Sequence, residues 1–144
     1  MAQYQIKNPD YEQEVRASFA QQSFMAYLGA ELTAVSPGQV TIELPVSAQL
    51  SQQHGFVHAG ATTAVVDSAC GYATLSLLPP GSEVLTTEFK VNLLSPAQGV
   101  KLIAIGRVIK PGRTLTVCLG ELFAVDEVGA QTLCALMTAT IMCR

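Results

Sequence analysis

The chain has 144 residues, a length that suits one domain built around one hydrophobic core. Apolar residues make up 49% of it and charged residues only 13%, and its net charge of −3 with no basic tract excludes a nucleic-acid partner. So few charges cannot cover the surface of a small domain, and we expect part of that surface to be buried against another copy.

The N-terminal residues 1–28 are predicted to be a helical region. Asn8 or Asp10 is a suitable cap, and apolar side chains then recur at helical spacing as far as about Leu28. Gly29 follows and is expected to close this helix.

Two strands are predicted next, at Ala30–Val35 and Gln39–Val46, with a Ser-Pro-Gly turn between them. Apolar and polar residues alternate well in the second strand, as in a strand with one buried face. Pro45 near its end predicts an edge position in the sheet, because proline cannot donate a ladder hydrogen bond.

A polar loop, Ala48–Val57, precedes a long helix predicted at His58–Leu78. This run is rich in alanine and contains no proline, and it ends before Pro79 and Pro80. One carboxylate, Asp67, lies within it. An unpaired charge in such a run costs several kcal/mol, so Asp67 must be paired, protonated or functional.

The rest of the chain is predicted to be sheet. Short joints with hairpin chemistry separate four strand-length segments, so consecutive strands are expected to be antiparallel neighbours. Strands of this length favour a strongly curved sheet. The predicted fold is therefore α+β, a single domain over residues 1–144 in which a curved antiparallel sheet of about six strands wraps around the long central helix. The four segments are Val84–Leu94, Val100–Lys110, Arg113–Val125 and Gln131–Met142.

The cysteines have no C-x-x-C spacing and no histidine partner, so no metal site is expected. The polar N-terminus does not match a signal peptide, which favours reduced thiols and a cytoplasmic location. No membrane association is expected either, because the longest apolar run carries Asp67 and several hydroxyl groups. The cysteines concerned are Cys70, Cys118, Cys134 and Cys143.

The segment HGFVHAGATTAVVDSACGYA resembles the signature of the hotdog-fold acyl-CoA thioesterases, in the phenylacetate-degradation (PaaI-like) branch. That branch has Asn-x-x-Gly-x-x-His-Gly-Gly and then an Asp seven residues later. The runs TTEFKVNLLSPAQG and GRVIKPGRTLTVCLGELF also resemble it in the same order, so the likeness covers about Leu28 to Met142. The matching positions are Gln52, Gly55, His58, Ala59, Gly60 and Asp67.

Two positions depart from that pattern. Gln52 replaces the asparagine and is one methylene longer, and Ala59 replaces the first glycine after the histidine. Alanine at position 59 would be strained if the backbone needed a positive φ there. It would be harmless if only the N–H at the helix start is used.

The resemblance implies hydrolysis of an acyl-CoA to a carboxylic acid and free coenzyme A, with no cofactor besides the coenzyme A of the substrate. It also implies a homodimer or homotetramer with the site at the subunit interface. Asp67 would be the general base or the nucleophile, and amides at the helix start would bind the oxyanion. Gln52 and His58 would hold the thioester or water, and Thr86 would orient the water. The implied catalytic set is Asp67, Gln52, His58, Ala59, Gly60 and Thr86.

A second group of residues is expected to bind substrate. Tyr72 is a candidate for the acyl pocket, together with Phe24 and Tyr27, and the basic turn from Lys110 to Arg113 for the coenzyme A phosphates. The aromatic acyl group suggested by the branch and medium or long aliphatic chains are both open. The predicted substrate-binding residues are Gly55, Thr87, Tyr72, Lys90, Lys110 and Arg113, with Thr87 the alternative to Thr86 if the register differs by one.

Asp67 lies nine residues after His58, about half a turn out of phase and two to three turns along the helix. One helix cannot easily bring both to the same carbonyl. We therefore expect the helix start of one chain to face Asp67 of another.

Other interpretations remain open. Asp67 could instead be a structural hydrogen-bond acceptor, and the chain could be an acyl-CoA-binding scaffold that has lost turnover. An enoyl-CoA hydratase or dehydratase is disfavoured, because such enzymes usually place a histidine a few residues after the helix Asp. No histidine follows Asp67 in this sequence.

Overall fold

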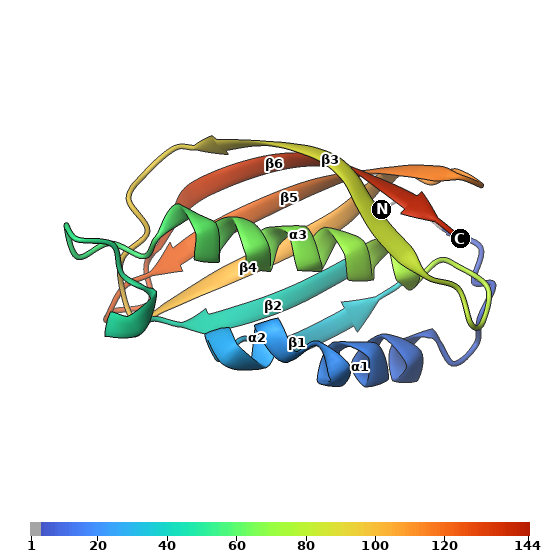
Figure 1. Cartoon of the computed structure of the whole chain (residues 1–144), viewed down its shortest axis with the longest axis horizontal. Coiled ribbons are helices and arrows are strands. Elements are labelled where there is room, and N and C mark those ends of the chain that lie inside the picture. The colour runs from blue at the N-terminus through green and yellow to red at the C-terminus, as the bar shows by residue number, and fades with distance from the viewer. Residues whose placement is uncertain (1–3) are drawn as a thin grey trace.

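A six-stranded antiparallel sheet curls around one long helix in this computed structural model, which describes residues 4–144 (Figure 1). Two shorter helices precede the sheet, and a single 3-10 turn, Ala48–Leu50, precedes the long helix. The helices are α1 (Tyr11–Gln21), α2 (Ser23–Leu28) and α3 (Ala59–Leu75). The strands are β1 (Glu31–Ser36), β2 (Gln39–Pro45), β3 (Val84–Leu93), β4 (Lys101–Lys110), β5 (Leu115–Val125) and β6 (Gln131–Cys143).

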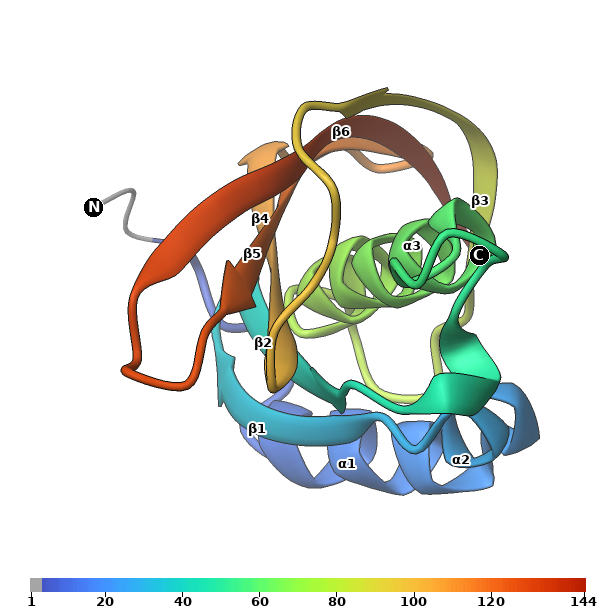
Figure 2. The same ribbon diagram turned by 90° about the vertical axis from the view of Figure 1, so that its left-hand side faces the viewer.

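The strand order across the sheet is β1-β2-β4-β5-β6-β3, and every pairing is antiparallel. Seen end-on, the sheet encloses α3 on its concave side, and α1 and α2 lie below β1 (Figure 2). Alternate residues of β2 and β4 face the helix and are fully buried, as the alternating pattern of the second strand predicts. This arrangement is the hotdog fold, and it confirms the predicted fold class.

One predicted hairpin is wrong. The segments that became β3 and β4 are consecutive in the chain but are not neighbours in the sheet. β3 pairs with β6 instead, and β4 pairs with β2. The connection crosses the open end of the sheet, where Ala97 accepts a hydrogen bond from the Val57 amide and Val100 accepts one from the Val46 amide. Turn residues establish where a strand ends, but partner choice depends on contacts that are distant in the sequence.

The prediction of an edge position for Pro45 is also wrong. Strand β2 lies between β1 and β4, and Pro45 pairs with Lys101 as the last residue of β2. The pairing with β1 stops two residues earlier, at Glu43. The proline therefore lies past the end of the ladder with β1, where its missing N–H costs nothing.

The single N-terminal helix predicted as far as Leu28 is in fact two helices. Gln22 interrupts them with an extended backbone, at φ −81° and ψ 92°. The break turns α2 so that Met25 and Leu28 are buried in the core. Gly29 ends α2 at φ +79°, as predicted.

The backbone of α3 lies directly on β4 and β5 because two glycines face each other there. Gly106 pairs with Gly120 across the two strands. A Cβ on Gly106 would overlap the backbone of Ala69 and Cys70, and one on Gly120 would overlap the Val66 side chain. Close contact between helix and sheet therefore depends on the missing side chains.

We expect Gly106→Ala to lower the free energy of unfolding by about 3 kcal/mol, because the obstructing atoms are helix backbone that cannot move aside. Urea unfolding measures the change. Gly71→Ala on α3 is the matched control, since its new methyl group would meet only Val84 Cγ2 at 3.9 Å. The control should raise the stability by about 1 kcal/mol through helix propensity alone. Equal effects of the two variants would contradict this account of the packing.

Within residues 4–144, no helix is both long enough and apolar enough to span a bilayer.

Candidate active site

Asp67 lies in the middle of α3, where its Oδ1 accepts a hydrogen bond of 2.7 Å from the Thr86 hydroxyl on β3. Burial raises the pKa of Asp67 above its ordinary value, and the bond from Thr86 partly opposes this shift. Thr87, by contrast, donates to the Thr140 carbonyl and is exposed. Of the two threonines, the structure therefore brings Thr86 and not Thr87 to the carboxylate.

A pocket of about 530 Å³ opens beside Asp67. Its floor is one face of α3, which contributes Asp67, Gly71 and Tyr72, and its walls come from the end of α1 and the beginning of β3. The predicted acyl-pocket residue Tyr72 is therefore next to the carboxylate. Phe24 and Tyr27 do not line this pocket, and their side chains are 50% and 83% exposed on α2.

The start of α3 is capped by the side chain of His58. Its Nδ1 accepts a hydrogen bond of 2.8 Å from the Gly60 amide, and its carbonyl accepts from the amides of Ala61 and Thr62. A Cβ on residue 60 would lie 3.0 Å from Nδ1, so any other residue there would press against the imidazole that makes the cap. With Nδ1 accepting, the neutral imidazole carries its proton on Nε2 and can donate to a ligand.

Ala59 is the first residue of α3, and its amide has no acceptor among residues 4–144. Because no non-glycine residue in that range has a positive φ, alanine at this position is unstrained. The substitution of alanine for glycine thus leaves the N–H intact and available. It points out of the positive end of the helix, where a developing negative charge is stabilised.

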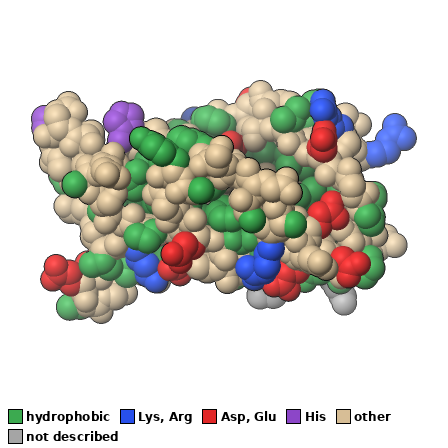
Figure 3. Space-filling view, turned by 60° about the horizontal axis from the view of Figure 1, so that its bottom comes forward, with side chains coloured by type: hydrophobic (Ala, Val, Ile, Leu, Met, Phe, Trp, Pro, Cys, Tyr) green, Lys and Arg blue, Asp and Glu red, His purple; other side chains and the backbone are tan. Residues whose placement is uncertain are grey.

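The loop before α3 holds Gln52 close to this helix start. The Gln52 Oε1 accepts from the amides of His54 and Phe56, which leaves its NH₂ group as the donor available to a ligand. Gly55 makes the tight turn of this loop with φ +85°. Gln52, His58 and Ala59 line a second pocket, of about 510 Å³, and both histidines lie at this end of the molecule (Figure 3).

The predicted catalytic residues thus form two separate groups within one chain. Asp67 and Thr86 line the first pocket, whereas Gln52, His58 and Ala59 line the second. Asp67 follows Ala59 by eight residues, or about 12 Å of helix. Neither group on its own combines a base with oxyanion donors.

The predicted cationic residues are outside both pockets. Lys90 is exposed on β3, and Lys110 is exposed at the end of β4. Arg113 lines a third pocket of about 450 Å³ together with Lys7 and Tyr4. None of these three cations lines the Asp67 pocket or the Ala59 pocket.

Several residues that line the Asp67 pocket were not predicted as site residues, among them Ser18, Gln22, Ser68 and Gly71. A signal for Ser68 and Gly71 exists in the sequence. Ser68 and Gly71 follow Asp67 by one and four residues, and they interrupt a helix that is otherwise rich in alanine and valine. Ser18 and Gln22 had no such signal, because their approach to α3 depends on the fold.

The cysteines form no disulfide in the part of the chain that the structure describes. All four are free, and three are buried. A hydrogen bond with Cys118 and burial both raise the pKa of Cys70, so this thiol is a poor nucleophile despite its place on α3. Among the described residues, no three histidine, cysteine or acidic side chains are grouped so that they could hold a metal ion.

Comparison with known proteins gives consistent results. The family model described as the thioesterase superfamily matches residues 54–130, more than half of the chain. A solved thioesterase family protein from Silicibacter pomeroyi is 49% identical, with a TM-score of 0.90, over 92% of this chain and 97% of that one. The PaaI protein of the Escherichia coli phenylacetic acid degradation operon shares the fold, with a TM-score of 0.82 at 21% identity over 94% of each chain.

Among curated proteins, one from Halobacterium salinarum is 32% identical over 98 residues, which are 65% of this chain. The chain spans 64% of the length of that relative, and also 64% of a second relative from Saccharolobus solfataricus.

Proposed function

Because this chain belongs to the thioesterase superfamily, we propose that it hydrolyses acyl-CoA thioesters to a carboxylic acid and free coenzyme A. The observation that carries the proposal is the state of Asp67, a half-buried carboxylate with a raised pKa, bound by Thr86 and facing a pocket. A base with a raised pKa suits general-base work near neutral pH.

The second requirement of the reaction is a donor for the oxyanion. The Ala59 amide, which has no acceptor within residues 4–144, lies at the positive end of α3 and suits this role. His58 and Gln52 offer further donors to the thioester from the same pocket.

We propose that two chains complete each site. Strand β3 is at the edge of the sheet, and it exposes Leu85, Phe89 and Leu93, each at least 45% exposed. An unpaired edge with apolar side chains favours pairing with the same edge of a second copy. Thr86 and Leu93 lie on this strand, and they line the Asp67 pocket and the Ala59 pocket respectively. Pairing along β3 would therefore bring Asp67 of one chain towards Ala59 of the other.

In the proposed reaction, the carbonyl oxygen of the thioester accepts from the Ala59 amide. Asp67 either takes a proton from a water molecule that attacks the carbonyl carbon, or attacks this carbon itself and is later released by water. In both routes the C–S bond breaks as the tetrahedral adduct collapses, and the coenzyme A thiolate leaves and takes up a proton. In the second route this step comes before water releases the acyl group from Asp67. None of these steps requires a metal or a redox cofactor. Contact of Lys110 and Arg113 with the phosphates of coenzyme A stays a prediction.

The test is release of free thiol from a panel of acyl-CoAs, with the wild type and Asp67→Ala side by side. Turnover by the wild type that is lost in a folded, still dimeric variant supports the proposal. Tight binding of acyl-CoA without turnover by the wild type would instead identify an acyl-CoA-binding scaffold.

A further inference from the structure

Strand β3 lies at an edge of the sheet, and the middle of this strand carries two opposite charges on one face. Glu88 and Lys90 pair with Thr140 and Thr138 of β6. Both threonines are on the convex face of the sheet, because the alternate residues of β6 over 135–141 are buried on the side of α3 (Figure 2). Directly paired residues share a face, so Glu88 and Lys90 are on the convex face as well.

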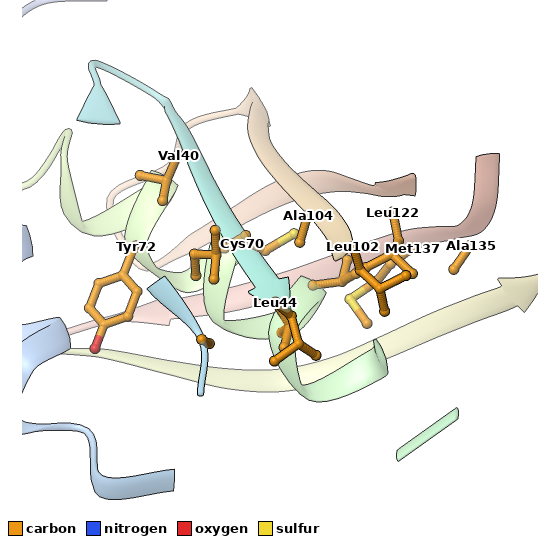
Figure 4. Close-up of a cluster of buried hydrophobic side chains, with 14 of the residues drawn as sticks. Val40, Leu44, Cys70, Tyr72, Leu102, Ala104, Leu122, Ala135 and Met137 are labelled. Carbon is orange, nitrogen blue, oxygen red and sulfur yellow. The ribbon is translucent and has the colours of Figure 1, made fainter. Parts of the chain in front are cut away.

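Residues that alternate with these charges form an apolar row on the concave face. Val91 and Leu93 pair with Met137 and Ala135, which belong to the buried hydrophobic cluster (Figure 4). Phe89 continues this row, yet it is 45% exposed because β3 has no strand on its outer side. The free side of β3 therefore presents apolar groups on one face and a charge of each sign on the other.

Neither charge has an opposite charge beside it in its own chain. None of the ion pairs formed within residues 4–144 includes Glu88 or Lys90. The Thr140 hydroxyl donates to Glu88 Oε1 at 3.0 Å, which holds the carboxylate beside the strand and leaves Oε2 for a second donor. The edge can therefore accept one cation from a partner and supply another to it.

Two copies of β3 can pair as antiparallel edges in a limited number of registers. A two-fold axis relates the copies, and paired residues must share a face of the sheet. The axis therefore passes between a residue and its own equivalent, because an axis placed half a residue away would pair side chains of opposite faces. Three registers then keep the middle of β3 paired, with Glu88, Phe89 or Lys90 on the axis.

Charge separates these three registers. With Glu88 on the axis two carboxylates face each other, and with Lys90 on the axis two ammonium groups do. Like charges directly opposite one another weaken a strand pair. With Phe89 on the axis, each Glu88 instead lies opposite Lys90 of the partner subunit. Two ion pairs then flank an aromatic pair, so this register satisfies both charges and covers the exposed Phe89 ring.

The register with the aromatic pair on the axis also aligns the two groups of predicted catalytic residues. The pairing of β3 with β6 shifts at Thr87, which is an extra residue in β3. Counted past this bulge, Val84 lies opposite the partner's Leu93. Val84 lines the Asp67 pocket and Leu93 lines the Ala59 pocket, so this register brings the two pockets together across the interface. Either of the other registers slides them apart by two residues, about 7 Å.

Resting on the proposed function, we propose that Glu88, Phe89 and Lys90 set the register in which two chains complete their active sites. Each Glu88 binds the partner's Lys90, and the two Phe89 rings meet on the axis. This role of Lys90 takes the place of its predicted contact with substrate. The three are positioning residues, since they act only through the alignment of Asp67 with Ala59 of the partner subunit.

Single cysteines report the register directly. After mild oxidation with copper phenanthroline, Phe89→Cys should cross-link to its own equivalent, as seen on a non-reducing gel. Glu88→Cys and Lys90→Cys should each fail to cross-link alone, because their equivalents are diagonal neighbours about 7–8 Å apart, beyond the usual reach of a disulfide. When co-expressed, these two variants should cross-link to each other. The wild type is the control for the native cysteines, three of which are buried.

Charge reversal tests the two ion pairs. Glu88→Lys and Lys90→Glu each place like charges opposite one another, so each alone should raise the dimer Kd about tenfold or more in low salt. A chain with both reversals restores opposite charges and should dimerise nearly as well as the wild type. When the two single reversals are co-expressed with different affinity tags, mixed dimers should exceed the half expected from random pairing. Glu127→Lys, in the exposed loop after β5, is the matched control and should leave the Kd and the random pairing unchanged.

Thiol release links the register to the reaction. At protein concentrations where every variant is dimeric, each single reversal should lower kcat about tenfold or more, and the double reversal should restore it. An unchanged kcat in the dimeric single reversals overturns the positioning role.

The cross-links separate this inference from the proposed function. A self-cross-link from Glu88→Cys or Lys90→Cys but none from Phe89→Cys, or mixed dimers at the random half, overturns the register and leaves hydrolysis standing. The expected cross-links and mixed dimers without thiol release from any acyl-CoA support the register and overturn the hydrolase instead.

Discussion

Asp67→Asn is expected to lower kcat by about a thousandfold or more, because the amide can neither take a proton from water nor attack the thioester. The substitution keeps the size of the side chain, and its oxygen can still accept from Thr86. Steady-state thiol release measures the loss. A variant that retains a tenth of the activity would show that the carboxylate is structural and that another group is the base.

The same variant tests how Asp67 contributes to stability. A folded-state pKa above the ordinary value means that the native chain binds more protons than the unfolded chain between the two pKa values. The free energy of unfolding of the wild type therefore falls as the pH rises through this window. Above the window, the contribution of Asp67 to stability is at its lowest. We expect Asp67→Asn to be at least as stable as the wild type at pH 7, with the difference shrinking as the pH is lowered. Thermal unfolding across this range measures it.

The ionisation of Asp67 should also control activity, which should rise with pH where stability falls. The proposed base works only as the carboxylate, so kcat/KM should decline as the pH falls through the raised pKa of Asp67. Thr86→Val removes the one hydrogen bond that opposes this shift. In the plot of kcat/KM against pH, the acid limb of this variant should therefore lie at higher pH than that of the wild type. If the limb does not move, the ionisation that causes it belongs to a group other than Asp67.

The sequence predicted the parts of this molecule that depend on local patterns. The alanine-rich run with one carboxylate identified α3 and Asp67, and the alternation of apolar residues identified the buried face of β2. The spacing from Gln52 to Asp67 identified the family, which the match over residues 54–130 confirms. Each of these signals lies within about 20 residues of chain.

What the sequence did not predict depends on contacts between distant segments. The partner of β3 is β6, about 50 residues later, and no turn chemistry encodes that choice. The break at Gln22 has no proline or glycine to mark it, and the contacts of its side chain with Ser68 and Tyr72 on α3 join segments about 50 residues apart. The role of Gly60 likewise became clear only from the His58 ring that fills the space beside it. Local patterns thus located Asp67, while the shape of its pocket required the fold.

The oxyanion role of the Ala59 amide can be tested by removing a single hydrogen. Ala59→Pro deletes the N–H at the first position of α3, where proline is well tolerated in helices. The preceding His58 already has an extended backbone, with ψ 138°, which suits a residue before proline. No hydrogen bond within residues 4–144 is lost. We expect kcat to fall about a hundredfold with little change in the melting temperature. Ala59→Val, which keeps the N–H, is the control for side-chain bulk.

Combining the two defective chains tests whether each site draws on both subunits. Asp67→Asn and Ala59→Pro should each be nearly inactive alone, but a dimer of one with the other contains one site with an intact Ala59 amide and an intact Asp67. Random pairing of equal amounts makes half of the dimers mixed, each with one working site of two, so activity should recover to about a quarter of wild type. Co-expression with two different affinity tags isolates the mixed dimer, whose activity should be about half of wild type by the same count. A site built within one chain would recover nothing, because each chain would then carry its own defect into its own site.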